Sequence, residues 1–479
     1  MHCTCKGALG LERLLPVPHP PIRAWTFVSL LILLVSVEAG ASITFEADSL
    51  LLRERNIAPI GPIPQPAEAD SHVAATPEAS ENAANLYSEA YWAAVADLDL
   101  AGSLKAARNR PELEFAHGLT FLAGGDRERA QHSFADLSVG ISDLNVAVAA
   151  QMMLAHTLMY DQKWALLRDL PASPALGVAD QSNAMEIERW GHAFANIEPQ
   201  SILFPAKPVS LPLRITAVGT PSLRVKINGR EYTFWLDTGS SMTVLSSEVA
   251  AKTHSPVISD DTLTVRTFAG VAEVRAAMVR KLELGPIVLT NSPVIVMDDA
   301  MMRVKASGDG GPWANHRVDG IIGWDIIRQI DVLLDYQDRV VTLARPQRFG
   351  MVEGATPSLM WVGRPLIKVR GKRGETLHLA LDTGAQATLL NATVLEKLGM
   401  TGRAVDAKVF GIAKTGSSTN RLISALTLDV AGRSIILENV IVYGPSYSGL
   451  IGCDGILGSD LAQFGSLHID ATNGIFSVG

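Results

Sequence analysis

Two aspartates occupy the same short motif at two places in the chain. The sequence Leu-Asp-Thr-Gly-Ser at residues 236–240 returns as Leu-Asp-Thr-Gly-Ala at residues 381–385. Two carboxyl groups a few ångströms apart cannot both ionise without a large cost, so such a pair shares one proton. The ionised carboxylate can take a proton from water while the protonated one donates to the carbonyl oxygen of an amide. If the two copies face each other, we expect Asp237 and Asp382 to hydrolyse peptide bonds as a pair, with no metal or other cofactor.

The residues that follow each aspartate suit this chemistry. Gly239 and Gly384 leave the backbone free to turn tightly and to aim an N–H at a carboxylate. The hydroxyl of Ser240 is expected to donate to the outer oxygen of the first aspartate, which Ala385 cannot do for the second. Hydrogen bonds to an ionised carboxylate lower its pKa, so the second aspartate is expected to be the less acidic one. This asymmetry predicts a mildly acidic to neutral pH optimum.

The duplication extends well beyond the motif. Residues 318–325 are echoed by residues 453–460. Ser246 and Asn391 stand at the same distance after their aspartates, and both are good N-cap residues, so each is expected to open a short helix. Further matches at equal distances from the two aspartates are Gly229 with Gly374, Thr243 with Thr388, and Leu245 with Leu390. A fixed internal period indicates one structural unit used twice.

The hydrophobic pattern from residue 205 onward is typical of β-strands. Apolar and charged residues alternate over residues 223–227, and Asn-Gly at 228–229 is a strong hairpin signal because both residues tolerate positive φ. A segment with two prolines, residues 344–360, separates two such regions. We therefore expect a mainly β fold made of two duplicated lobes, at residues 205–345 and 360–479.

Residues 205–479 resemble the pepsin/retropepsin class of aspartic proteases. The resemblance rests on Asp-Thr-Gly at the end of a strand in both copies and on an apolar-apolar-Gly segment farther along each, at 321–323 and 456–458. It implies that the second segment crosses behind the aspartate loop and braces it. It also implies that the hydroxyls of Thr238 and Thr383 bond across the lobe interface. With a helical N-terminal part on an exported chain, the resemblance suggests a bacterial, retropepsin-like endopeptidase with a polypeptide substrate.

Each lobe also offers a hairpin, or flap, that is expected to cover the substrate. In the first lobe it lies within residues 263–274 and contains Phe268 and Gly270; in the second the matching residues are Phe410 and Gly411. No tyrosine stands where the pepsin-like pattern carries one, and phenylalanine can cover the site but cannot donate a hydrogen bond. A cleft lined by such strands favours apolar residues at the cleaved bond. The alternative is an ordinary hairpin with a buried phenylalanine in each lobe.

Residues 78–200 carry a helical pattern. Apolar and aromatic residues recur at helical spacing, and residues 113–137 are expected to form two antiparallel helices around Gly-Gly-Asp at 124–126. Small residues at the expected contacts between the helices resemble a tetratricopeptide unit, with residues 153–170 as a degenerate second unit. A generic helical bundle is the alternative. Such a domain is a candidate surface for a protein partner.

Residues 1–41 have the pattern of an export signal. Basic residues precede an apolar run from Ala24 to Val37, which is shorter than the ~20 residues that span a bilayer, and Ala-Gly-Ala at 39–41 is a small-x-small cleavage site. Residues 42–77 are rich in alanine and proline and are expected to be a linker. We therefore expect a periplasmic or secreted protein. The alternative is an uncleaved signal that tethers the chain to the membrane.

Composition sets the remaining limits. The chain has 479 residues, of which 47% are hydrophobic and 19% charged, as in globular proteins, and its formal charge of -8 gives no basic face for nucleic acid. Cleavage of the signal would leave Cys453 as the remaining cysteine, so no intramolecular disulfide is expected. Two functions fit the sequence. The first is an exported aspartic endopeptidase; the second is a non-catalytic interaction protein that uses the helical domain and an inactive, protease-like clamp for peptides.

Overall fold

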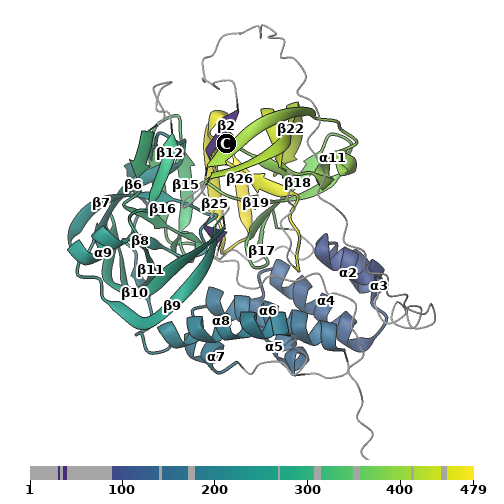
Figure 1. Ribbon diagram of the computed structural model, residues 1–479, viewed down its shortest axis with the longest axis horizontal. Coiled ribbons are helices and arrows are strands. Elements are labelled where there is room, and N and C mark those ends of the chain that lie inside the picture. The colour runs from purple at the N-terminus through teal and green to yellow at the C-terminus, as the bar shows by residue number, and fades with distance from the viewer. Residues whose placement is uncertain are drawn as a thin grey trace, which may run out of the picture.

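The computed structural model describes residues 31–32, 36–39, 89–139, 143–170, 178–267, 270–306, 314–348, 357–410, 415–443 and 450–479. Helices lie together along one side of the molecule, and two β-rich lobes stand above them (Figure 1). Pairing of β10 with β6 closes the sheet of the first lobe, and pairing of β18 with β22 closes that of the second. The described part of the chain is therefore mainly β, with two closed barrels.

The helical domain covers the described residues between 89 and 194. Its elements are α2 (Glu89–Ala96), α3 (Leu100–Ala106), α4 (Arg110–Ala123), α5 (Arg127–Ser138), α6 (Leu144–Tyr160), α7 (Trp164–Arg168) and α8 (Val178–Phe194). Four of these helices begin at a side chain that accepts a hydrogen bond from the first turn, which explains their starting points: Asp99, Asn109, Asp126 and Asp143.

The expected helical hairpin is present as α4 and α5. The chain turns at Gly124 and Gly125, and Gly125 adopts a φ of 80°, which favours glycine. Phe115 and Phe134 pack between the two helices with ring centroids 5.5 Å apart, and both are fully buried. The tetratricopeptide-like character of this domain stays a prediction.

The first lobe surrounds the first aspartate motif. Its elements are β3 (Ser201–Leu203), β5 (Arg214–Ile215), β6 (Pro221–Ile227), β7 (Arg230–Leu236), β8 (Val244–Ser246), α9 (Ser247–Lys252), β9 (Val257–Thr267), β10 (Gly270–Leu284), β11 (Ile287–Met297), β12 (Arg303–Ala306), β13 (Ala314–Arg317), β14 (Gly320–Ile322) and α10 (Trp324–Ile327). The expected hairpin joins β6 to β7, where Asn228 and Gly229 have φ of 48° and 85°.

The second lobe repeats this plan around the second motif. Its elements are β17 (Leu359–Trp361), β18 (Pro365–Gly371), β19 (Thr376–Leu381), β20 (Leu389–Asn391), α11 (Thr393–Leu398), β21 (Arg403–Phe410), β22 (Thr415–Val430), β23 (Arg433–Tyr443), β24 (Gly455–Leu457) and the 3₁₀ helix η2 (Ser459–Phe464). In both lobes the apolar-apolar-Gly strand pairs parallel to the strand that precedes the aspartate, as β14 with β7 and β24 with β19.

The two expected helix caps differ in outcome. Ser246 caps α9 by accepting from the N–H of Val249, as predicted. Asn391 does not cap α11, which begins at Thr393 without a side-chain cap, so that prediction was wrong. Asn391 is buried, and its amide donates instead to the carbonyl oxygen of Cys453. A buried carbonyl without a donor is costly, so the asparagine satisfies that group in preference to the helix end.

A shared sheet joins the lobes. It runs in the order β26 (Ile475–Val478), β25 (Ser466–Asp470), β15 (Asp331–Asp335), β16 (Val340–Ala344), β4 (Val209–Pro212). The central neighbours β15 and β25 are the equivalent strands of the two copies, and they pair antiparallel, with Val332 opposite Ile469. Equivalent strands meet in this way when two copies are related by a pseudo-two-fold axis.

The helical domain packs against the lobes through one continuous hydrophobic cluster. Trp190 of α8, Met242 from the first aspartate loop and Leu263 of β9 are buried members of this cluster. Glu186 of α8 accepts a hydrogen bond from the backbone N–H of Thr264 in β9 at 2.8 Å. The helices therefore support the first lobe next to its aspartate loop and along one strand of its flap hairpin.

Candidate active site

Asp237 and Asp382 begin the loops that follow β7 and β19. The backbone N–H of Asp237 donates to the carbonyl oxygen of Ile322 at 3.0 Å, and that of Asp382 donates to Leu457 at 3.0 Å. Ile322 and Leu457 are the apolar residues directly before the glycine in the two apolar-apolar-Gly segments. These segments therefore brace the aspartate loops from behind, as the resemblance implied.

The two carboxyl groups meet at the lobe interface. A Cβ placed on Gly239 would lie 2.5 Å from Cγ of Asp382, and one placed on Gly384 would lie 2.5 Å from Cγ of Asp237. Each carboxyl group thus packs against the glycine of the opposite loop, and a side chain at either position would clash with it. Glycine is required here for this close approach rather than for a turn.

Each carboxyl group is held by backbone donors. Oδ1 of Asp237 accepts from the N–H groups of Gly239 at 2.8 Å and Ser240 at 3.2 Å, and Oδ1 of Asp382 accepts from Gly384 at 2.9 Å and Ala385 at 3.0 Å. The two Oδ2 atoms are buried and have no hydrogen-bond partner among the described residues. Each aspartate therefore keeps one carboxyl oxygen outside these backbone hydrogen bonds, on matched supports.

Thr238 and Thr383 tie the two loops together. The hydroxyl of Thr238 donates to the carbonyl oxygen of Leu381 at 2.9 Å, and that of Thr383 donates to Leu236 at 2.7 Å. Each hydroxyl also accepts from the backbone N–H of the other threonine, at 3.1 and 3.0 Å. Four hydrogen bonds between the lobes, all buried, fix the separation of the two aspartates, in agreement with the expectation for both threonines.

Burial controls the charge of the pair. Asp237 and Asp382 are 0% and 1% exposed. Burial raises the pKa of both carboxyl groups, and the negative charge of Asp237 raises the pKa of Asp382 further, against the lowering effect of the backbone N–H groups. The pair titrates as one unit, and its first ionisation leaves a single proton shared between the two carboxyl groups.

The predicted role of the Ser240 hydroxyl was wrong. Its backbone N–H supports Asp237, but its hydroxyl donates to the carbonyl oxygen of Met242 at 2.7 Å. The local turn offers this carbonyl, and the hydroxyl satisfies it instead of the carboxylate. Each aspartate therefore accepts from a matching pair of backbone N–H groups, and the pKa values are raised by burial, and at Asp382 also by the charge of Asp237, rather than by a missing hydroxyl at Ala385.

A second pair of acids lies behind the dyad, and sequence reasoning assigned it no role. The hydroxyl of Thr243 donates to Oδ1 of Asp325 at 2.9 Å, and that of Thr388 donates to Oδ1 of Asp460 at 2.8 Å. The hydroxyl of Thr243 also accepts from the backbone N–H of Gly323 at 3.2 Å, and that of Thr388 accepts from Gly458 at 3.1 Å. The signal was present in the sequence, because both acids and both threonines recur at matching positions.

The two hairpins that are expected to act as flaps are present as β9–β10 and β21–β22. Gly270 pairs with Thr267 at the end of the first hairpin, and Phe410 pairs with Thr415 at the end of the second. Phe268 and Gly411 lie outside the described residues. The substrate-covering role of Phe268, Gly270, Phe410 and Gly411 stays a prediction.

A segment near the N-terminus bridges these hairpins. Strand β1 (Leu31–Ile32) pairs parallel with residues 266–267 of β9, and β2 (Ser36–Ala39) pairs antiparallel with residues 407–410 of β21. Strands β9 and β21 are equivalents in the two lobes. Both short strands therefore pair with equivalent strands of the two lobes, one in the parallel and one in the antiparallel sense.

Comparison with known proteins connects the first lobe to a family. Residues 223–326 match the family model described as "Aspartyl protease"; the match contains Asp237 and ends before Asp382. None of the curated proteins matches the chain. The solved structure of a retropepsin-like aspartic protease from Rickettsia conorii is 12% identical, with a TM-score of 0.20, over 30% of this chain and 92% of that chain. The family match supports a protease hydrolase of the aspartyl class.

Proposed function

We propose that this protein is an aspartic endopeptidase in which Asp237 and Asp382 activate a water molecule against a peptide bond. One observation carries the proposal: two buried carboxyl groups from equivalent loops meet at the lobe interface, each with an Oδ2 outside the backbone hydrogen bonds that hold it. Burying two acids in such contact costs free energy, and pairs of this kind are concentrated at functional sites. The family match over residues 223–326 supports the same class of reaction.

The geometry suits a water held between the two Oδ2 atoms. The ionised carboxylate takes a proton from this water as its oxygen bonds to the carbonyl carbon, and the protonated carboxyl gives its proton to the carbonyl oxygen. The tetrahedral intermediate then collapses: the C–N electron pair leaves with nitrogen, which takes the proton held by the first carboxyl. A hydroxyl of the intermediate returns its proton to the other aspartate. The pair regains one proton, and water has been added across the amide.

The substrate is proposed to bind as an extended strand between the two flaps. The backbone pairing of β1 and β2 supports this mode, because it places one segment against β9 and β21 together. Main-chain pairing of this kind gives affinity that depends little on sequence, and pockets for alternate side chains then give selectivity. We propose apolar side chains at the cleaved bond.

Export is part of the proposal. The basic, apolar and small-x-small pattern of residues 1–41 supports a cleaved signal and a periplasmic or secreted product. No helix in the described ranges has the length and hydropathy needed to cross a bilayer. Sequencing the N-terminus of the protein recovered from the expressing bacterium tests this point, since a start at Ser42 is expected and a start at Met1 contradicts it.

The activity is tested with the full chain and an unfolded protein substrate. Cleavage is expected for the wild type, with inhibition by a statine-type peptide that mimics the tetrahedral intermediate. The Asp382→Asn variant is expected to cleave about 10²–10⁴-fold more slowly. Asp429→Asn is the matched control, because Asp429 is exposed and supports a turn at Gly432 far along the chain from the dyad. Absence of inhibitor-sensitive cleavage at any pH from 3 to 8 would reject the proposal.

A non-catalytic peptide clamp is the second candidate. The almost complete burial of the dyad and the pairing of residues 31–32 and 36–39 with the two hairpins favour it, because both leave little of the dyad accessible. Under this reading the wild type binds unfolded peptides without cutting them, and the Asp382→Asn variant binds equally well. Cleavage by the wild type that the Asp382→Asn change removes decides against the clamp.

A further inference from the structure

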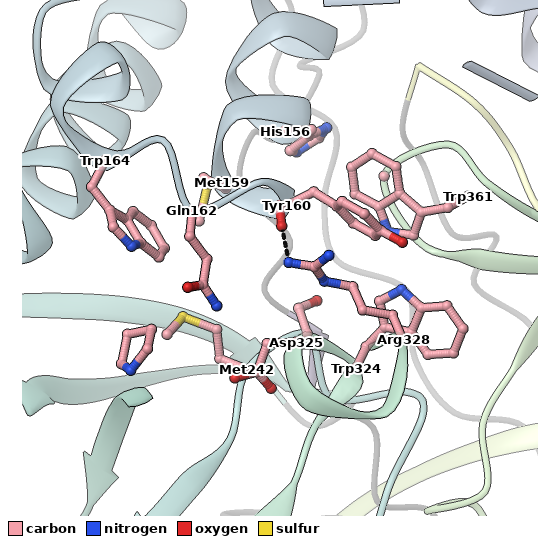
Figure 2. A pocket seen from close by; sticks show the side chains of 13 residues that line it. His156, Met159, Tyr160, Gln162, Trp164, Met242, Trp324, Asp325, Arg328 and Trp361 are labelled. Carbon is pink, nitrogen blue, oxygen red and sulfur yellow. Dashed lines mark hydrogen bonds between the residues drawn. The ribbon is translucent and has the colours of Figure 1, made fainter. Parts of the chain in front are cut away.

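A cavity lies where the helical domain meets the first lobe (Figure 2). Its volume is about 60 Å³, which is room for a few water molecules or for the end of one organic group. The walls include Met159 from α6, Met242 and Pro293 from the first lobe, and Trp361 from β17. These side chains make most of the cavity apolar. The dyad lies elsewhere, and none of its residues lines this space.

Four polar side chains on the wall have unsatisfied atoms: Trp164, Trp324, Asp325 and His156, whose Nδ1 has no partner among the described residues. Trp164 and Trp324 are 6% and 3% exposed, and the Nε1 of each has no hydrogen-bond acceptor in the described part of the chain. An indole N–H can only donate, so each needs an acceptor that the protein does not supply. Asp325 is 7% exposed, and its Oδ2 also has no partner. Groups of this kind are normally paired, so their concentration around one cavity points to an occupant.

Arg328 brings positive charge to the same space. Its guanidinium donates to the backbone carbonyl oxygen of Tyr160 and lies 4.0 Å from the centre of that ring. Among the described residues it forms no ion pair with a carboxylate. Figure 2 shows this guanidinium reaching between Tyr160 and Asp325. A guanidinium with free donors is the group best suited to a carboxylate, because its planar fork matches two oxygens.

We propose that this cavity binds the carboxylate of a small apolar acid, held by Arg328 and Trp324. Two sources of this chemistry exist: a free aliphatic acid, and the C-terminal residue of a peptide. A carboxylate supplies up to four acceptor positions, which matches the surplus of donors, and the attached apolar group packs against the methionine, proline and tryptophan wall. The proposal does not depend on proteolysis.

The other ionisable groups set the pH dependence. Burial raises the pKa of Asp325 to about 7, against the lowering effects of Thr243 and Arg328. Below that pH the protonated carboxyl can donate to the ligand, and above it the negative charge opposes the ligand. Burial and Arg364 lower the pKa of His156 to about 4, so that side chain is neutral throughout this range. Binding is therefore expected to weaken as the pH rises through about 7.

The cavity is connected to the dyad. The backbone N–H of Trp324 donates to the carbonyl oxygen of Ser240 at 2.6 Å, and Asp325 accepts from Thr243. Ser240 in turn donates its N–H to Asp237. A ligand that contacts Trp324 and Asp325 therefore touches the residues that hold the first aspartate loop.

Calorimetric titration of the full chain tests the proposal, with Asp382→Asn as the background so that no peptide is cleaved. The probes are 3-methylbutanoate and a tetrapeptide that ends in leucine; the same peptide with a C-terminal amide is the ligand control. Binding of at least one carboxylate at pH 6, weaker binding at pH 8.5 and no binding of the amide are expected. The tighter of the two carboxylates identifies the source.

Three variants assign the binding to the cavity. Trp324→Phe and Arg328→Met each remove a donor and are expected to weaken binding by about tenfold or more. Trp190→Phe is the matched control: its buried Nε1 is also unpartnered, but it does not line the cavity, so affinity should not change. Thermal unfolding of each variant reports folding. Failure of both carboxylates to bind, equal binding of the amide, or an equal loss in Trp190→Phe overturns the proposal and leaves a cavity filled by water.

Discussion

In the second lobe both oxygens of Asp460 are hydrogen-bonded to Thr388, to its hydroxyl at 2.8 Å and to its N–H at 2.9 Å. In the first lobe Asp325 accepts from the hydroxyl of Thr243 at 2.9 Å, and its second oxygen has no hydrogen-bond partner among the described residues. The dyad halves in front of these acids match almost bond for bond. The two copies therefore agree where the aspartates must meet and differ where the helical domain packs.

The residue beside each acid shows how the difference arises. Trp324 precedes Asp325 and is part of the cavity wall, whereas Ser459 precedes Asp460 and donates its hydroxyl to the carbonyl oxygen of Thr383 at 2.6 Å. A large indole extends toward the helices, while a small hydroxyl stays within its own lobe. The two lobes are copies of one unit, and the first lobe differs from the second where it contacts the helical domain.

The strongest test of the matched halves is replacement of each aspartate. Asp237→Asn and Asp382→Asn are both expected to lower the rate of cleavage by about 10²–10⁴-fold, because either change removes the shared proton system. Single-turnover cleavage of an unfolded protein measures the effect, with Asp429→Asn as the control. A variant that keeps more than a tenth of the wild-type rate would show that one aspartate works alone.

The pH profile of cleavage tests the same symmetry. Burial raises the pKa of the pair, so the acid limb, where the second carboxyl becomes protonated and no base remains, is expected above the ordinary value of 3.8. Activity should fall about tenfold for each pH unit below that limb. Because the Ser240 hydroxyl bonds to Met242, Ser240→Ala should leave the position of the limb unchanged. A limb below pH 3.8, or a limb that moves in Ser240→Ala, contradicts this view.

Replacement of Thr238 and Thr383 compares how much the hydrogen bonds of each threonine across the lobe interface contribute to the free energy of unfolding. Thr238→Val and Thr383→Val each leave a buried carbonyl oxygen and a buried N–H without a partner, at about 1–3 kcal/mol for each group. Equal losses in the free energy of unfolding are expected from urea titration. Thr→Ser at either position keeps the hydroxyl and should cost far less. Unequal losses would show that one lobe carries the interface.

Asp325 and Asp460 differ in their hydrogen bonds, so replacing each by asparagine is expected to change the free energy of unfolding differently. In Asp325→Asn the amide oxygen keeps the bond from Thr243 and an uncharged NH₂ replaces the unpartnered oxygen. In Asp460→Asn one of two accepted bonds is lost, which costs about 1–3 kcal/mol. At pH 7 the free energy of unfolding should therefore fall for Asp460→Asn and stay equal or rise for Asp325→Asn.

The pH dependence of the free energy of unfolding tests the same two acids. Burial raises the pKa of Asp325 to about 7 and that of Asp460 to about 6, both above the ordinary 3.8. A raised pKa in the folded state contributes stability at low pH, and that stability is lost as the pH rises from 3.8 through the folded value. The wild type should lose stability between pH 4.5 and 7, and Asp325→Asn should lose less. The free energy of unfolding is measured by urea titration at several pH values. An equal fall with pH in the wild type and in Asp325→Asn would contradict the assignment.

The sequence predicted the parts of the site that the duplication repeats. Asp237 and Asp382 follow from two copies of one motif, and the crossing threonines were implied by the resemblance to the pepsin/retropepsin class. Ser240 and Asn391 were misjudged because each side chain is satisfied by a nearby carbonyl that only the folded loop provides. The cavity at Trp324 was not predictable, since it depends on how distant helices pack against the lobe, and hydrophobic periodicity carries no information about that contact.

The smallest expected effect concerns residues 31–32 and 36–39, which pair in the parallel sense with one hairpin and in the antiparallel sense with the other. Residues 31–32 pair parallel with β9 and residues 36–39 pair antiparallel with β21, so a substrate strand must displace them to reach both flaps. A chain that begins at Ser42 should therefore show a lower KM for an unfolded substrate, with kcat unchanged, because the chemistry of the dyad is the same in both forms. A full-length chain in which the adjacent residues Val37 and Glu38 are both replaced by proline is the second measurement: the change removes the N–H on both sides of the strand, weakens the pairing with β21, and should lower KM in the same direction as in the shortened chain. Equal KM for all three forms would mean that the segment does not compete with substrate, and a lower kcat in the shortened chain would mean that it supports the site.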